Sequence, residues 1–199
     1  MRLFYAPGAC SLAPHIVINE AGLEVALDKV TFGKERTTES GRDFYSINPQ
    51  GAVPALELDG GEVLTEAQVI LQYLAAQKPE KSLTVDHGLA HWRFLETLNF
   101  IATELHKGTS PLFRNPTPEA KEAIIKTLTD RYALLTKKLG DKDYLLGDFT
   151  VADAYAFVVL RWARRFEVEI GEKLETYFQR VMARPAVQKT LEQEGLPTS

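Results

Sequence analysis

Cys10 is the only cysteine of the chain and its strongest candidate nucleophile. It follows the turn sequence Ala6-Pro7-Gly8-Ala9 and stands where a helix is expected to begin. Backbone N–H groups at a helix N-terminus stabilise a thiolate and lower a thiol pKa from its usual value of about 8.5. The alternative is a small buried apolar residue, since free cysteines are often only that. The next residue, Ser11, is either a second hydrogen-bond donor near the sulfur or a plain helix cap.

The dipeptide Val53-Pro54 is the second unusual feature, because a proline cannot donate to a sheet and yet stands where a strand begins. The preceding Asn48-Pro49-Gln50-Gly51 has turn chemistry, and residues 53–58 alternate between apolar and polar. One interpretation is the first residue of an edge strand. The other is a cis Val53–Pro54 bond, which turns the Val53 backbone outward.

Three polar residues interrupt the apolar side of a helix predicted from His87 to Lys107. Asn99, Thr103 and His106 fall at i, i+4 and i+7, so they share one stripe of that helix. A polar group on a buried stripe needs a partner or a function. The alternative is an ordinary polar face, which we favour for Thr103.

The elements before residue 79 alternate between strands and helices. The patterns predict strands at 2–5, 25–32, 53–58 and 63–64, and helices at 12–22, around 41–45 and from 66 onward. Asp59-Gly60-Gly61 is a hairpin signal, and Thr65 is expected to cap the helix after it. The order βαβ–α–ββα predicts an α/β, thioredoxin-like domain over residues 1–78.

The strand signal disappears after a linker at residues 79–86. Helices are predicted at 87–107, 117–139, 172–183 and 186–194, and another begins after Thr150. Asp153 stands three residues after Thr150 and completes a capping box with a short acid. Residues 87–199 are therefore expected to form an all-α C-terminal domain.

Composition excludes several classes of protein. The 199 residues are 45% hydrophobic and 25% charged, with a formal net charge of −4 and no basic patch for nucleic acid. We find no signal peptide and no apolar run long enough to cross a membrane. A single cysteine fits a reducing compartment, so the expected location is the cytoplasm. The histidines share no spacing with carboxylates that suggests a metal site.

Four segments resemble the glutathione transferases in order and spacing. GAVPALELDGGEVLTEAQVILQYL is similar to the glutathione-binding core of that family, and GDFTVAD to its helical folding motif. LFYAPGACSLAPHI and NFIATELHKGTSPLF resemble the bacterial beta class, which has a cysteine at the position of Cys10. The resemblance covers nearly the whole chain and implies the glutathione transferase fold, a homodimer and glutathione as co-substrate.

The resemblance also implies how the first domain holds glutathione. A cis Pro54 leaves the N–H and C=O of Val53 to pair with the tripeptide as an added strand. The helix beginning near Glu66 offers free N–H groups to the γ-glutamyl carboxylate, and the Glu66 carboxylate takes the ammonium. The family usually has Ser and sometimes Gly where this chain has Ala67, so only the backbone contact is expected there.

Further site residues are carried over from the beta class. The equivalents of His106 and Lys107 border the sulfur and the glycine end of glutathione. Beside them we expect Cys10 to face the glutathione sulfur and the nearby Glu104 only to orient donors. Asn99 reaches the γ-glutamyl group held by the neighbouring subunit. A cation for the glycine carboxylate is expected before Thr38-Glu39-Ser40-Gly41, but the stretch is one residue longer than the family pattern. Arg36 is the first candidate for that cation and Lys34 the second.

The implied activity is conjugation of the glutathione thiolate to small hydrophobic electrophiles, as in detoxification. A rival is a glutathione-dependent thiol–disulfide oxidoreductase or peroxidase, in which Cys10 works with glutathione because the chain has no C-x-x-C pair. The other rival is a non-catalytic glutathione-fold binding protein. No metal, nucleic acid or membrane is expected as a partner.

Overall fold

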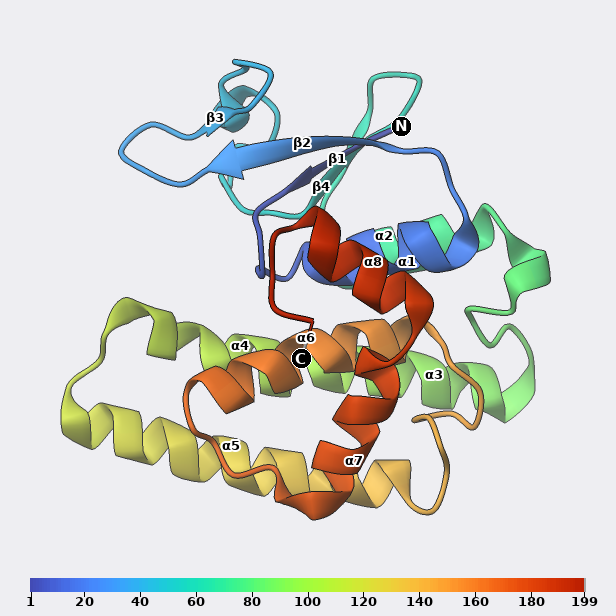
Figure 1. The fold of residues 1–199 in the computed structure, drawn as a ribbon, viewed down its shortest axis with the longest axis vertical. Helices are drawn as coiled ribbons and strands as arrows, with labels where there is room; N and C mark the ends of the chain where they lie inside the picture. Colours follow the sequence, from blue (N-terminus) through green and yellow to red (C-terminus); the bar gives the residue numbers. More distant parts are fainter. Residues whose placement is uncertain (199) are drawn as a thin grey trace. The chain divides into compact units, whose positions relative to one another are not determined.

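The chain divides into two units, which the computed structural model describes over residues 1–198 (Figure 1). One unit contains Met1–Ser82 and the described residues from Arg184 onward, and the other contains Leu83–Ala183. Helix α8 (Pro185–Gln193) therefore belongs with the first unit, whereas the sequence placed it in the helical domain. It lies alongside α1 (Leu12–Ala21) and buries Val187 and Leu191 completely (Figure 1). Apolar spacing predicts that a terminal helix is buried on one side but not which domain covers it.

A five-stranded sheet in the order β3-β2-β1-β4-β5 organises the first unit. Its strands are β1 (Arg2–Tyr5), β2 (Ala26–Thr31), β3 (Thr37–Thr38), β4 (Ala55–Glu57) and β5 (Val63–Leu64). Helix α1 carries the chain from β1 to β2, which pair in parallel, and the other pairs are antiparallel. This confirms the thioredoxin-like α/β domain. Because β4 lies between β1 and β5, the interpretation of Pro54 as the start of an edge strand is wrong.

The predicted hairpin connects β4 to β5 and leads into α2 (Ala67–Ala76). The N–H of Gly61 donates to the Leu58 carbonyl over 2.9 Å, and Gly61 has a φ of +88° that favours glycine. Two short 3₁₀ segments, η1 (Phe44–Ser46) and η2 (Pro79–Lys81), complete the unit. The cap predicted at Thr65 is wrong, because the residue that precedes α2 is Glu66.

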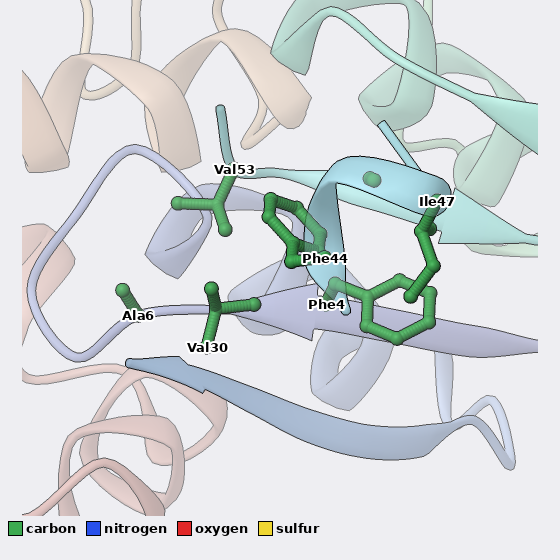
Figure 2. Packing of buried hydrophobic residues seen from close by; sticks show 7 residues of the cluster. Phe4, Ala6, Val30, Phe44, Ile47 and Val53 are labelled. Atoms are coloured by element: carbon green, nitrogen blue, oxygen red, sulfur yellow. The ribbon is translucent and has the colours of Figure 1, made fainter. Parts of the chain in front are cut away.

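A cluster of buried apolar side chains lies between β1 and η1 (Figure 2). Its members come from strands and loops that are far apart in the sequence: Phe4, Ala6, Val30, Phe44, Ile47, Val53 and Ala55. The rings of Phe4 and Phe44 lie 5.8 Å apart at a tilt, as aromatic pairs prefer. Packing in this cluster fixes the loop that carries Val53 relative to the sheet.

The second unit is helical in residues 83–183, as predicted. Its elements are α3 (Gly88–Phe100), a π-helical turn η3 (Ile101–His106), α4 (Lys107–Thr109), a 3₁₀ turn η4 (Ser110–Arg114), α5 (Pro118–Leu139), α6 (Val151–Arg165) and α7 (Gly171–Met182). The continuous helix expected from His87 to Lys107 is thus interrupted by a π turn. Such turns insert one residue into a helix and occur frequently at functional sites.

The predicted capping box at the start of α6 is present and fully buried. The N–H of Thr150 donates to the Asp153 carboxylate over 2.8 Å, and the Leu145 N–H donates to it over 2.9 Å. The Tyr177 hydroxyl donates to the same carboxylate over 2.7 Å. A buried carboxylate is stable only with such donors, so this one ties α6 to α7 and to the preceding loop.

One side of α3 carries large apolar side chains that are exposed. Trp92 has 65% of its surface exposed, and Leu89 has 70% exposed. Phe94 and Leu98 are buried instead. No helix within residues 1–198 combines the length and apolar character needed to cross a membrane.

Candidate functional site

Cys10 lies in the turn between β1 and α1 with its side chain partly exposed. Its thiol donates a hydrogen bond to the Val53 carbonyl oxygen over 3.1 Å. Its own carbonyl accepts from the N–H of Ala13 over 3.2 Å, so Cys10 lies just before the first turn of α1. The fold therefore brings the one thiol of the chain against the backbone of the segment predicted to bind a peptide.

The Ser11 side chain forms its hydrogen bonds within the turn before α1 and not with the Cys10 sulfur. Its hydroxyl oxygen accepts from the N–H of Ala6 over 3.0 Å and donates to the carbonyl of the same residue over 3.2 Å. The side chain is completely buried and caps no N–H of α1. The hydroxyl proton is thus already used, which corrects the prediction of a donor to the sulfur and that of a side-chain cap.

The Val53 backbone stands at the end of the sheet ladder. The Val53–Pro54 bond is cis, as the second interpretation of Pro54 predicted. The last pair between β1 and β4 is Phe4 with Ala55, so the ladder stops before Val53. Its carbonyl accepts from the Cys10 thiol, and its N–H has no acceptor within residues 1–198. A free N–H beside a strand end can pair with an added extended chain.

The residues before Val53 form a rigid turn. The buried Asn48 side chain donates to the Ala52 carbonyl over 2.7 Å and accepts from the Gln50 N–H over 3.1 Å. Gly51 has a φ of +61°, and a Cβ built there would come within 2.5 Å of the Tyr45 ring. Only glycine therefore fits this position, and the turn stays closely packed against Tyr45.

The start of α2 offers unsatisfied backbone donors next to a carboxylate. Glu66 precedes the helix with a φ of +65°, a conformation that L-residues seldom adopt and that clusters at functional sites. The helix has no side-chain cap, and its first bonds to the Glu66 carbonyl come from Val69 and Ile70, each over 3.0 Å. Among residues 1–198 the N–H groups of Ala67 and Gln68 have no acceptor, so they can bind an anion.

Arg36 is held by aromatic rings close to this part of the chain. Its guanidinium lies over the Phe32 ring at 4.7 Å and over the Tyr45 ring at 5.6 Å from the centroids. A Cβ at Gly51 would lie 3.0 Å from Arg36 Nη1, so the cation is beside the turn that leads to Val53. Lys34 is exposed and forms no ion pair within residues 1–198. Cation–π contacts fix the orientation of Arg36, and Lys34 lacks such contacts.

His106 is the last residue of the π turn, and aromatic side chains of α6 surround it in the second unit. Its Nδ1 is hydrogen-bonded to the Tyr155 hydroxyl over 2.6 Å, and its ring makes an edge contact with Trp162 at 5.0 Å. Burial, with the nearby charge of Lys107, lowers the pKa of His106 to about 4. The imidazole is therefore neutral near pH 7 and has one N–H to donate.

The other predicted residues of this region are on the surface. Asn99, Thr103 and Lys107 are exposed, and the Thr103 hydroxyl donates to the Asn99 carbonyl over 3.1 Å. Glu104 pairs with Arg131 of α5 over 2.8 Å. The predicted stripe thus separates into an exposed pair and the half-buried His106, because the π turn changes the helical register between them.

Several residues of the site were not predicted. Phe32 and Tyr45 orient Arg36, and Tyr155 and Trp162 surround His106. For Phe32 and Tyr45, the only signal in the sequence is that they are aromatic residues in segments close to Arg36. Tyr155 and Trp162 could be predicted only from the packing of α6 on the π turn. Within residues 1–198 no group of three or more acidic, histidine or cysteine residues could hold a metal ion.

Two family models match the chain. Residues 1–76 match the glutathione S-transferase N-terminal domain, and residues 100–185 match the glutathione S-transferase C-terminal domain. Glutathione S-transferase GstA of Escherichia coli O157:H7 is 43% identical over 98% of this chain and 100% of its own length. Glutathione S-transferase GST-4.5 of Xanthomonas campestris pv. campestris is 35% identical over 98% of this chain and 100% of its own.

Solved structures agree with these relatives. A sphingomonad glutathione S-transferase complexed with glutathione is 42% identical and superposes with a TM-score of 0.92, over 99% of this chain and 100% of that one. A bacterial beta class glutathione S-transferase from Sphingomonas chungbukensis is 40% identical with a TM-score of 0.93, over the same shares of the two chains. The chain therefore belongs to the glutathione S-transferase family and is of the bacterial beta class.

Proposed function

We propose that this protein binds glutathione along the Val53 backbone and transfers its thiolate to small hydrophobic electrophiles. The observation that carries the proposal is the free N–H of Val53 beside the Cys10 thiol, which is 3.1 Å from the carbonyl of the same residue. An extended tripeptide fits a strand end that exposes a backbone donor. Relatives named glutathione S-transferases, and a similar structure complexed with glutathione, support this assignment.

Each charged group of glutathione has a complementary group in the first unit. The γ-glutamyl carboxylate meets the N–H groups of Ala67 and Gln68 at the start of α2. The exposed Glu66 carboxylate takes the γ-glutamyl ammonium, and the guanidinium of Arg36 takes the glycine carboxylate. The cysteinyl unit pairs with Val53, which places its sulfur towards Cys10.

The reaction needs a glutathione thiolate held against an electrophilic carbon. The sulfur attacks that carbon, the new carbon–sulfur bond forms, and a leaving group departs with its electron pair. Cys10 stabilises the thiolate by turning its S–H from the Val53 carbonyl to the glutathione sulfur. In the second unit, His106 is neutral near pH 7 and has one N–H to donate. In the second unit, the exposed ring of Phe113 packs edge-on against Trp162 and Phe166 and offers an apolar contact for a flat electrophile.

We expect Arg36→Ala to weaken glutathione binding by roughly ten- to a hundredfold, because a charge-assisted pair at a partly buried site contributes about 1.5–3 kcal/mol. The matched control is Lys34→Ala, which removes an exposed cation without the aromatic contacts. Isothermal titration with glutathione measures both dissociation constants. If Lys34→Ala loses more affinity for glutathione than Arg36→Ala does, then Lys34 and not Arg36 holds the glycine carboxylate.

A second candidate function is disulfide exchange, which the partly exposed Cys10 thiol beside Val53 favours. In that reaction the Cys10 thiolate attacks the glutathionyl sulfur of a mixed disulfide and expels the other thiol as its thiolate. The thiolate of a second glutathione then attacks the Cys10–glutathione disulfide, which forms glutathione disulfide and releases the Cys10 thiolate. Conjugation uses the sulfur of glutathione instead. We therefore expect Cys10→Ala to keep much of the conjugation rate and to lose all disulfide exchange.

Turnover assays with an aryl halide and with a mixed disulfide measure the two rates side by side, and Cys10→Ser separates the role of a hydrogen-bond donor from that of a nucleophile. Loss of conjugation in Cys10→Ala with glutathione still bound would make Cys10 essential to both reactions. If the unmodified protein shows neither conjugation nor disulfide exchange, only non-catalytic binding of glutathione remains as its function.

We also propose that the protein is a homodimer in the cytoplasm. Leu89, Trp92 and Asn99 stand three and seven residues apart, so they share the exposed face of α3. Exposed large apolar side chains grouped on one face mark an interaction surface. A partner seated there would cover Trp92 and receive Asn99. The single cysteine supports a reducing compartment.

Trp92→Glu should convert the dimer to a monomer at micromolar concentration, because it places an unpaired charge where an aromatic side chain would be buried. Lys126→Glu, an exposed position of α5, introduces the same side chain outside this face and should leave the dimer intact. Sedimentation velocity distinguishes the two states. A monomer in the unmodified protein would rule out the interface.

A further inference from the structure

The segment after α8 contributes a buried carboxylate to the turn that carries Cys10. Glu194 has only 6% of its surface exposed. One of its carboxylate oxygens accepts from the Gly8 N–H over 2.8 Å, and the other is hydrogen-bonded to His15 Nδ1 over 2.9 Å. A carboxylate is costly to bury, so one held by a backbone donor and a ring nitrogen indicates a specific role for this geometry.

The surroundings of Glu194 are built from three separate parts of the first unit. His15 of α1 is almost fully buried, and its Nε2 is hydrogen-bonded to the Gln193 side chain over 3.0 Å. The Tyr5 ring of β1 makes an edge contact with the His15 ring at 5.7 Å. Burial, and then the charge of Glu194, raises the pKa of the Tyr5 hydroxyl. Because β1, α1 and the C-terminal segment all contribute, the network holds the Glu194 carboxylate in one orientation.

The same segment covers the turn with an apolar side chain. Gly8 has a φ of +71°, and a Cβ built there would lie 3.6 Å from the Leu196 side chain. The turn closes through the Ala9 N–H, which donates to the Ala6 carbonyl over 3.0 Å. Gly8 is two residues before Cys10, so whatever fixes Gly8 also limits where the Cys10 thiol can lie.

We infer that Glu194 is a positioning residue for Cys10: its carboxylate anchors Gly8 and thereby keeps the thiol on the Val53 carbonyl. The inference rests on the proposed role of Cys10 at the glutathione site. The residue acts through the turn and touches no reacting atom. The mechanism described above places no function in the C-terminal segment, and this anchor gives it one.

The reactivity of the thiol tests the inference without glutathione. Since Cys10 is the only cysteine, the rate of alkylation by iodoacetamide reports on this side chain alone. Glu194→Ala removes the acceptor of the Gly8 N–H and should raise the alkylation rate at fixed pH by roughly fivefold, the effect of losing one hydrogen bond on a local opening equilibrium. Glu194→Gln keeps an oxygen for Gly8 and should restore the unmodified rate.

Two controls separate positioning from loosening of α8. Glu192→Ala removes an exposed carboxylate from the end of the same helix, and Thr190→Val removes a hydrogen bond between Asn19 and α8 without touching the turn. Both should alkylate at the unmodified rate. Equal rates in Glu194→Ala and Thr190→Val would overturn the inference, since both would then report only a loosened helix.

A measurement on the unmodified chain covers the case in which Glu194→Ala does not fold. The Gly8 amide should exchange with solvent at least about a hundredfold more slowly than the exposed Gly33 amide. If the Gly8 amide exchanges at the same rate as the Gly33 amide, Glu194 does not hold Gly8 and the inference is wrong. A chain that fails to conjugate glutathione but shows the expected alkylation rates would reject the proposed function and leave the positioning role of Glu194 intact.

Discussion

The first unit depends on one constraint at Val53: the side chain must be buried while the backbone must remain available. The side chain packs in the cluster that contains Phe4 and Phe44, where only 8% of Val53 is exposed (Figure 2). The ladder between β1 and β4 stops short of it, so its N–H has no acceptor in the described part of the chain and its carbonyl accepts from the Cys10 thiol. Burial of the side chain thus supplies the stability that keeps a polar backbone group open.

Other features of the site depend on the same division between buried support and open polar groups. Phe32 and Tyr45 support the guanidinium of Arg36, and the closely packed Gly51 turn lies beside it. Glu66 adopts a φ of +65° and begins α2 without a side-chain cap, which leaves N–H groups for an anion. In the second unit, aromatic side chains surround His106 and keep it neutral near pH 7. Binding groups held in place before the ligand arrives lose less entropy on binding.

Features that depend on local chemistry could be predicted from the sequence. The hairpin at Asp59-Gly60-Gly61 and the capping box of Thr150 and Asp153 follow from residues close together in the chain. Their order along the chain was enough to predict both domain types. The cis bond at Pro54 was one of two open interpretations, and the resemblance to the glutathione transferases favoured it. The helix ends were predicted to within a residue or two where a proline or glycine marks them, as at Gly140.

Features that depend on distant contacts could not be predicted. The π turn before His106 keeps a helical pattern in the sequence, so the change of register has no local signal. The hydroxyl of Ser11 is used by Ala6, and α8 packs on α1, through contacts that form only in the folded chain. The exposure of Trp92 and Leu89 on α3 likewise has no local signal, since apolar residue type alone predicts burial.

The most direct test of the account is the exchange of the Val53 amide with solvent, followed by NMR with and without saturating glutathione. This N–H has no acceptor within residues 1–198, so it should exchange rapidly in the free protein. Glutathione should slow it by at least about tenfold, as expected for a newly formed backbone hydrogen bond. An exchange rate that glutathione does not change, under conditions in which it binds, would contradict recognition through the Val53 backbone.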